Sequence, residues 1–246
     1  MGELIAVLSG KGGTGKTSVC AGVATALAQA GEKVLCVDCD VGLRNLDISL
    51  GMTENGTLSF LDVCEGGYPL DQAPSHPAWP GLRFLTAPVN RSAASVAPEA
   101  FATLLGQARK AFDYVFLDAP GGVDAGVRLA AASADRIMLV TGADPAAVRD
   151  AARTGEVLEL MGKSNIRLVV NRVNRRMVST MEITVDDIMD TAGLPLLGVV
   201  PEDPDVTLAA AFGQSLLAYS PKCPAGRAFR RIAKRIQGLP VPISIR

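Results

Sequence analysis

Residues 10–17 read Gly-Lys-Gly-Gly-Thr-Gly-Lys-Thr and are the most informative segment of this 246-residue chain. They satisfy the spacing G-x-x-x-x-G-K-[ST], in which glycines let successive backbone N–H groups turn toward one anion. Lys16 can reach the β- and γ-phosphates of a nucleotide, and the Thr17 hydroxyl can bind Mg²⁺. A second lysine, Lys11, directly follows the first glycine. These residues predict a site that binds polyphosphate.

The flanking segments have the pattern that this motif requires. Residues 4–9 are apolar and read as a strand, and residues 16–30 read as an Ala-rich helix that stops at Gly31. A strand, a glycine-rich loop and a helix bring the positive end of the helix dipole to the phosphate. A glycine turn without a ligand is the alternative, and the flanking elements argue against it.

Apolar segments alternate with helical ones along the whole chain. This alternation predicts an α/β fold: a doubly wound, mainly parallel sheet of about seven to eight strands with helices on both faces. Residues 1–246 are expected to form a single domain, with a basic amphipathic helix at 225–237 and a tail at 238–246. The remaining strands are expected at residues 34–38, 82–86, 114–117, 136–140, 166–170 and 196–200, and helices at 98–111, 145–161 and 185–191.

Three aspartates follow predicted strands. Asp38 and Asp40 lie at the end of the strand at 34–38, and Asp118 follows the strand at 114–117. Parallel strands end at one edge of the sheet, so these carboxylates are expected near the phosphate loop. There a carboxylate can hold Mg²⁺ through its bound water, or orient the water that attacks the γ-phosphate. A turn or helix-cap residue is the alternative for each aspartate.

Two other strand ends supply candidate nucleotide contacts. Gly121 and Gly122 leave backbone N–H groups free to contact a γ-phosphate. Asn171 ends the strand at 166–170, and its amide can both donate to and accept from the edge of a purine. An asparagine that caps a loop is the alternative for Asn171.

The composition excludes several other classes of protein. The net charge is −1, so no global field favours nucleic acid. The chain begins without a leader sequence and holds no apolar run near the roughly 20 residues of a membrane span, so we expect a cytoplasmic protein with reduced thiols. Cys36 and Cys39 should point to opposite faces of one strand, so we do not expect them to share a metal. Both are interpreted as small apolar fillers, and a redox role is the alternative. A single histidine, His76, excludes a multi-histidine zinc site.

With these segments in place, the chain resembles the deviant-Walker-A (MinD/ParA) P-loop ATPases, and within that family the septum-site-determining MinD branch. The resemblance covers nearly the whole chain, and Gly-Leu-Arg-Asn-Leu-Asp before Ile48 is the segment that favours the MinD branch or the related flagellar-number regulators over the rest of the family. The similar segments are the deviant loop at 11–18, switch I at 38–47, switch II at 118–122, a nucleotide-side loop at 198–203 and the start of the last core helix at 219–229.

The resemblance implies residue roles at the matching positions. Catalysis would involve Lys11, Lys16 and Asp40, with Asp40 positioning the hydrolytic water. Thr17, Asp38 and Asp118 would hold Mg²⁺ and its water shell. The nucleotide would contact Gly10, Lys11, Gly12, Gly13, Thr14, Gly15, Lys16, Thr17, Ser18, Gly121, Asn171 and Pro201, with Asn171 reading adenine.

The resemblance also implies a cycle. ATP and Mg²⁺ would drive formation of a homodimer in which Lys11 crosses to the partner's nucleotide, and slow, partner-stimulated hydrolysis would reset it. A MinC-like division inhibitor and a MinE-like activator would bind near switch I, where Arg44, Asn45 and Asp47 lie. Peripheral association with the inner face of the cell membrane is a further expectation.

One feature departs from the family. MinD proteins usually end in a membrane-targeting helix, whereas two prolines in residues 238–246 forbid such a helix here. The helix at 225–237 could lie on anionic lipid, but packing on the core is the favoured alternative. The other functions considered are a ParA-type partition ATPase that binds DNA through Arg172, Arg175 and Arg176, a flagellar-number regulator, an iron–sulfur carrier and a nucleotide-binding regulator without turnover.

Overall fold

The computed structural model describes residues 1–41, 44–54, 58–88, 97–122, 125–174, 180 and 183–243. Within these ranges, seven strands form one parallel sheet in the order β3-β2-β4-β1-β5-β6-β7. The strands are β1 (Glu3–Leu8), β2 (Val34–Asp38), β3 (Leu82–Leu85), β4 (Tyr114–Asp118), β5 (Arg136–Thr141), β6 (Ile166–Val173) and β7 (Leu196–Pro201). The predicted fold class is confirmed, and each strand lies where the sequence placed it.

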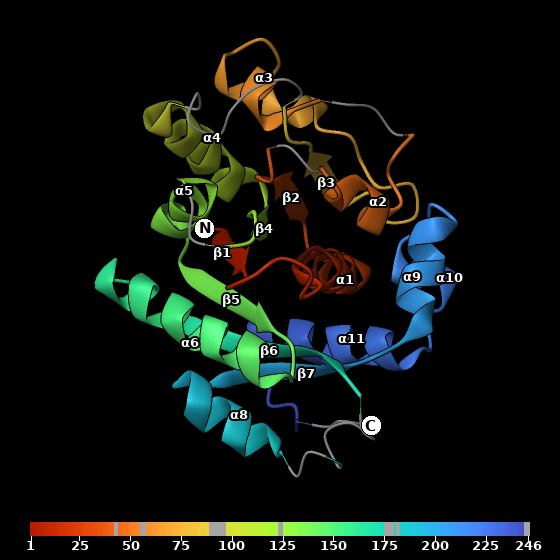
Figure 1. Cartoon of the computed structure of the whole chain (residues 1–246). Helices are drawn as coiled ribbons and strands as arrows, with labels where there is room; N and C mark the ends of the chain where they lie inside the picture. Colours follow the sequence, from red (N-terminus) through yellow and green to blue (C-terminus); the bar gives the residue numbers. More distant parts are fainter. Residues whose placement is uncertain are drawn as a thin grey trace.

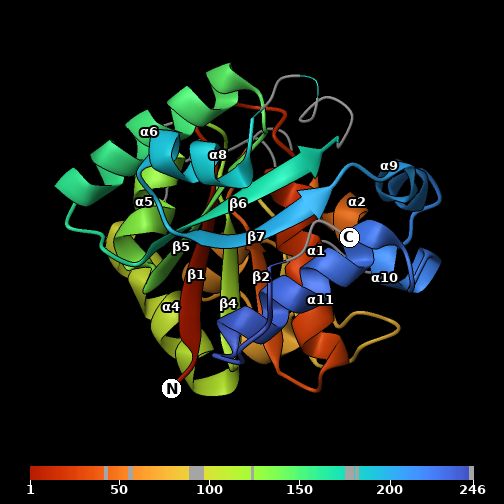
Figure 2. The same ribbon diagram turned by 90° about the horizontal axis from the view of Figure 1, so that it is seen from below.

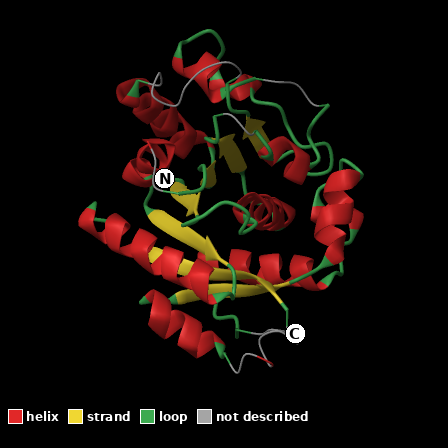
Figure 3. Ribbon diagram, in the orientation of Figure 1, coloured by secondary structure: helices red, strands yellow, loops and turns green. Residues whose placement is uncertain are grey.

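Helices cover both faces of the sheet (Figures 1 and 3). One face is covered by α1 (Lys16–Gln29), α2 (Leu46–Leu50), α9 (Pro204–Ala211), α10 (Leu216–Tyr219) and α11 (Pro224–Ile236). The other is covered by α3 (Phe60–Cys64), α4 (Pro98–Ala111), α5 (Ala125–Ser133), α6 (Pro145–Leu160) and α8 (Val185–Ala192), and a short 3-10 helix, η1 (Leu70–Gln72), precedes β3.

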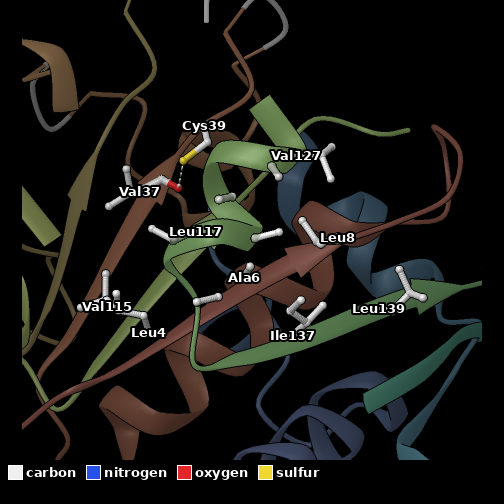
Figure 4. Close-up of a cluster of buried hydrophobic side chains, with 14 of the residues drawn as sticks. Leu4, Ala6, Leu8, Val37, Cys39, Val115, Leu117, Val127, Ile137 and Leu139 are labelled. Carbon is white, nitrogen blue, oxygen red and sulfur yellow. Dashed lines mark hydrogen bonds between the residues drawn. The ribbon is translucent and has the colours of Figure 1, made fainter. Parts of the chain in front are cut away.

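Strand side chains alternate between two cores, one on each face. Leu4 and Leu8 of β1 point into the cluster beneath α5, together with Val127 of that helix (Figure 4). Ile5 and Val7 of the same strand point into the cluster beneath α1. Because both faces are buried, the strands read as continuous apolar runs rather than alternating ones.

The two cysteines of the C-x-x-C sequence also separate between these cores. Cys36 packs beneath α1, and Cys39 packs in the opposite cluster. The prediction that they point to opposite faces is confirmed. Burial raises the pKa of the Cys39 thiol well above its ordinary value, which suits a packing role rather than a reactive one.

The basic helix α11 packs on the core, as the sequence favoured. Phe229, Ile232 and Ile236 are buried against α1 and β7. Gly22 of α1 permits this close packing, since a Cβ atom there would lie 2.2 Å from the Phe229 ring. The apolar face of α11 is therefore committed to the core of the domain.

His76 ties the segment before β3 to the end of α2. Its side chain is buried, and its Nδ1 accepts hydrogen bonds from the backbone N–H groups of Ala78, at 3.0 Å, and Trp79, at 3.3 Å. The proton of the neutral ring therefore lies on Nε2, which donates to the Leu50 carbonyl at 2.9 Å. Protonation of Nδ1 would break two of these three bonds.

We expect His76 to titrate below the ordinary value of 6.5, because burial lowers its pKa despite the opposing bond to Leu50. The folded protein then prefers the neutral ring, so this contribution to the free energy of unfolding is complete above pH 6.5 and is lost as the pH falls. His76 is the only histidine, so one imidazole NMR signal reports its titration. The urea-unfolded chain is the control, and a folded-state pKa at or above that of the unfolded chain would contradict the prediction.

Candidate functional site

The phosphate loop lies at the carboxyl end of the central strand β1 and leads into α1. Gly15 caps α1 with φ 81° and ψ 24°, and Gly13 also has φ 81°. Other residues are strained at such angles, which explains glycine at both positions. A Cβ atom on Gly15 would in addition lie 2.4 Å from Nδ2 of Asn171. The loop and the end of β6 are therefore closely packed.

Lys16 and Asp118 form a buried ion pair beneath this loop. Lys16 Nζ lies 2.6 Å from Asp118 Oδ1, and the two side chains are only 8% and 1% exposed. Burial alone would lower the pKa of Lys16, but the neighbouring Asp118 carboxylate outweighs it and raises that pKa. The lysine is therefore held as a cation at the floor of the loop, also 3.4 Å from the Thr17 hydroxyl.

Asp38 lies opposite Asp118 in the register of β2 and β4. It is fully buried, and its carboxylate accepts hydrogen bonds from the backbone N–H groups of Asp40, at 2.9 Å, and Leu46, at 3.2 Å. Burial, followed by the charge of Asp118, raises the pKa of Asp38 to about 7, although both backbone bonds oppose the change. One side chain thus connects the end of β2 to the start of α2.

The donors at this edge suit a hard divalent cation. Thr17, Asp38 and Asp118 supply only oxygen atoms, and the Thr17 hydroxyl is a hydrogen-bond partner of Asp118. No group of three or more His, Cys, Asp or Glu side chains that could hold a metal occurs among the described residues. Mg²⁺ commonly takes one or two protein ligands and completes its shell with water and phosphate oxygens. The residues therefore fit Mg²⁺ held jointly with a nucleotide.

An Asp38→Asn variant is expected to flatten the pH dependence of stability. Because the folded-state pKa of Asp38 is about 7 rather than 3.8, the folded protein holds this proton more tightly. The contribution is therefore complete below pH 3.8 and is lost as the pH rises toward 7. Urea unfolding between pH 5 and 8, without nucleotide or Mg²⁺, measures the slope in parent and variant. Parallel slopes for the two proteins would contradict a raised pKa at Asp38.

The second lysine of the loop points away from this buried pair. Lys11 is 40% exposed and forms an ion pair with Asp144, with 3.3 Å between Nζ and Oδ1. Asp144 is also the N-cap of α6, since the same oxygen accepts from the Ala147 N–H at 3.0 Å. Burial would raise the pKa of Asp144, but the bonds from Ala147 and Lys11 outweigh it and lower that pKa. Lys11 thus remains accessible while it is held within its own subunit.

Three more predicted site residues lie at the carboxyl ends of strands, and two of them contact the loop. Gly121 packs directly on it, since a Cβ atom there would lie 3.0 Å from the Gly12 nitrogen. Asn171 donates from Nδ2 to the Thr14 carbonyl at 2.8 Å. Pro201 ends β7, in register with Val173 of β6. The adenine-reading role of Asn171 stays a prediction. The bond to Thr14 uses a hydrogen of its side-chain NH2 group and leaves the side-chain oxygen for such a role.

Switch I, at residues 38–47, begins at Asp38, the last residue of β2. Asp40 is partly buried, and its charge contributes to raising the pKa of both Lys16 and Asp118. Arg44 has φ 45° and forms an ion pair with Asp47, with 3.8 Å between Nε and Oδ2. The loop between Asp40 and Arg44 includes residues 42–43, which lie outside the described ranges.

The edge of the sheet therefore holds a phosphate loop, a buried lysine, two carboxylates and an accessible second lysine. Residues 5–217 match the family model of the CobQ/CobB/MinD/ParA nucleotide binding domain. The chain belongs to the MinD/ParA family of P-loop ATPases. The second lysine is an addition that the common phosphate loop does not require.

Relatives within the MinD/ParA family are septum site-determining proteins. The chain is 37% identical to MinD of Synechocystis sp. over 98% of its length and 92% of the relative. It is 38% identical to MinD of Bacillus subtilis over 100% of its length and 92% of the relative. The sequence prediction of a MinD-like chain is confirmed.

Solved structures of MinD have the same fold. The MinC:MinD cell division protein complex of Aquifex aeolicus matches with a TM-score of 0.90 at 32% identity, covering 98% of each chain. MinD complexed with Mg-ADP from Pyrococcus horikoshii matches with a TM-score of 0.84 at 29% identity, covering 96% of each chain. A ParA family ATPase from Chlorobium tepidum, at 23% identity and a TM-score of 0.81, shares the fold alone.

Within this family site, Asp144 and Arg172 make polar contacts that were not predicted from the sequence. Asp144 binds Lys11, and Arg172 donates from Nη1 to the Gly13 carbonyl at 3.0 Å. The Asp-Pro pair at 144–145 does signal a helix N-cap, but it gives no indication of a lysine 133 residues away. Arg172 was considered only as part of a basic cluster. Arg175 and Arg176 of that cluster lie outside the described residues.

Proposed function

We propose that this protein is an ATP-dependent, dimerising switch that positions bacterial cell division by recruiting an inhibitor protein. ATP and Mg²⁺ are its ligands. The observation that carries the proposal is the convergence of Lys11, Lys16, Asp40 and Asp118 at one sheet edge, in a fold that matches MinD along the chain. Lys16 binds the phosphates, Asp118 holds Mg²⁺ and its water shell, and Asp40 orients the attacking water.

Dimerisation is supported by the position of Lys11. A lysine added to a phosphate loop contributes to transition-state stabilisation only where it reaches the reacting phosphates. Lys11 points to Asp144 rather than to Lys16, so within its own subunit it lies to one side of the buried pair. Lys11 would instead contact the nucleotide bound by a second copy of the chain, and in that position it could stabilise the transition state.

The proposed partners are a MinC-like inhibitor and a MinE-like activator. The Aquifex aeolicus relative is a MinC:MinD complex, which supports the first of these. Arg44, Asn45 and Asp47 are exposed or partly exposed at the start of α2. Asp38 connects this helix to the nucleotide edge through its bond to the Leu46 N–H. A partner on this surface would therefore contact residues that respond to the bound nucleotide.

The proposed location is the cytoplasm, with reversible attachment to the inner face of the membrane. No described helix is long and apolar enough to cross a membrane. The apolar face of α11 is buried, so its basic residues and the exposed Leu239 and Ile243 of the tail are the groups that remain for contact with anionic lipid. These basic residues are Arg227, Arg230, Arg231 and Lys234, whereas Arg235 donates to the Leu197 and Val241 carbonyls.

Sedimentation separates the membrane-bound switch from a DNA-binding partition ATPase. The protein is incubated with anionic liposomes or with nonspecific duplex DNA, each in Mg·ATP and in Mg·ADP. We expect ATP-dependent sedimentation with liposomes and none with DNA, and phosphate release in parallel confirms that ATP is turned over. Binding to DNA without binding to liposomes would overturn the division function in favour of a ParA-type function.

A further inference from the structure

The end of β6 holds the phosphate loop through two side chains. Asn171 is 5% exposed and donates to the Thr14 carbonyl at 2.8 Å, while Arg172 donates to the Gly13 carbonyl at 3.0 Å. The arrowhead of β6 accordingly ends beside the start of α1 (Figure 2). Two consecutive carbonyl groups of the loop are therefore bound by two consecutive residues of one strand.

The backbone of β6 is distorted at these same residues. Its register with β7 shifts between Val170 and Val173, on either side of the two donors. Arg172 has φ 54°, in the left-handed region where a side chain other than glycine is strained. Such strain persists where surrounding contacts hold it, and it concentrates at functional sites. The hydrogen bond from the Arg172 guanidinium to the Gly13 carbonyl is one such contact.

The planarity of the peptide bond links these carbonyl groups to the anion-binding face of the loop. In a trans peptide the C=O of one residue and the N–H of the next point in opposite directions. Binding of the Gly13 carbonyl by Arg172 therefore directs the Thr14 N–H away from β6. Binding of the Thr14 carbonyl by Asn171 does the same for the Gly15 N–H.

We propose that Arg172 is a positioning residue of the phosphate loop. From its strained backbone position it holds the Gly13 carbonyl, with Asn171 holding the next one, so that the N–H groups of Thr14 and Gly15 face the phosphates. This role rests on nucleotide binding by the loop and differs from the reading of adenine. It is exerted through the loop rather than by contact with the nucleotide.

Binding of a fluorescent ADP analogue tests the role in four proteins. Arg172→Ala should bind about tenfold more weakly, because a charged donor to the loop is lost. Arg172→Lys should stay within about threefold of the parent, since an ammonium can donate to the same carbonyl. Arg167→Ala is the matched control on β6, exposed and paired in register with Met138 rather than with the loop, and should bind like the parent.

Two further measurements separate positioning from a merely structural role. Arg172→Gly removes the strain together with the guanidinium, so it should unfold at a higher temperature than Arg172→Ala while binding ADP equally weakly. Amide hydrogen exchange at Thr14 and Gly15, measured at saturating ADP, should accelerate in Arg172→Ala but not in Arg167→Ala, because N–H groups that turn away from the phosphates lose the protection that the phosphates give.

The outcomes distinguish this role from the nucleotide site itself. ADP affinity of Arg172→Ala within twofold of the parent, or unchanged exchange at Thr14 and Gly15, would overturn the positioning role. Unchanged exchange with weakened ADP binding would instead assign Arg172 a direct contact with the nucleotide, which also overturns it. A parent protein that binds no ADP would contradict the nucleotide site rather than the role of Arg172.

Discussion

An Asp40→Ala variant is expected to bind Mg·ATP and to dimerise with it, while its hydrolysis rate falls by about 100- to 1,000-fold. Asp40 follows β2, and its backbone N–H is bound by the buried Asp38 at 2.9 Å, so its main chain is fixed by the end of the sheet. Removing the Asp40 carboxylate should therefore leave the backbone at residue 40 in place. The loss falls on the step in which water attacks, because a carboxylate there orients the water and takes its proton.

Phosphate release at saturating Mg·ATP measures the loss, and light scattering measures the dimer. Asp71→Ala serves as the control, since Asp71 is an exposed acidic residue of η1 that precedes β3, away from the loop. It should hydrolyse ATP like the parent. A fully active Asp40→Ala protein would remove Asp40 from the mechanism, whereas loss of ATP binding would show that it acts on the nucleotide site as a whole.

The strands and the phosphate loop could be predicted because their signals are local. A strand buried on both faces reads as a short apolar run, and the loop needs glycine at Gly13 and Gly15 for backbone reasons alone. Short helices gave no such signal. The helices α2 and α10 have five and four residues, which are too few for an apolar periodicity to appear. Their positions depend instead on packing in the core on the α1 face of the sheet.

The polar contacts of the site could not be predicted, because they join distant parts of the chain. The place of Asn171 at a strand end predicts that it reads adenine, which stays a prediction, but nothing in the sequence indicates its bond to the Thr14 carbonyl, 157 residues away. Arg172 follows the strand predicted at 166–170, and nothing in the sequence there indicates a positive φ. Both depend on how closely β6 approaches α1, which is a property of the packed domain.

A Lys11→Ala variant is expected to bind Mg·ATP within about threefold of the parent and to remain monomeric where the parent dimerises. Lys16 and Asp118 form the floor of the nucleotide site without Lys11, so binding within one subunit should persist. The dimer should be lost because Lys11 is proposed to contact the nucleotide of the second copy. Size-exclusion chromatography with light scattering, in ATP and in ADP, measures the change. Lys110→Ala, an exposed lysine of α4, is the control.

Asp144→Asn tests the same interface through the residue that binds Lys11 within its own subunit. Asparagine can still cap α6 through its side-chain oxygen, but it removes the charge that binds Lys11. An exposed ion pair contributes roughly 0.2–1 kcal/mol. If Lys11 of each subunit must leave Asp144 to cross the interface, the loss of both pairs should favour dimerisation by up to about 30-fold, about fivefold for each subunit. A dimer unchanged in Lys11→Ala would contradict the crossing. A dimer weakened in Asp144→Asn would show that the pair forms part of the interface rather than competing with it.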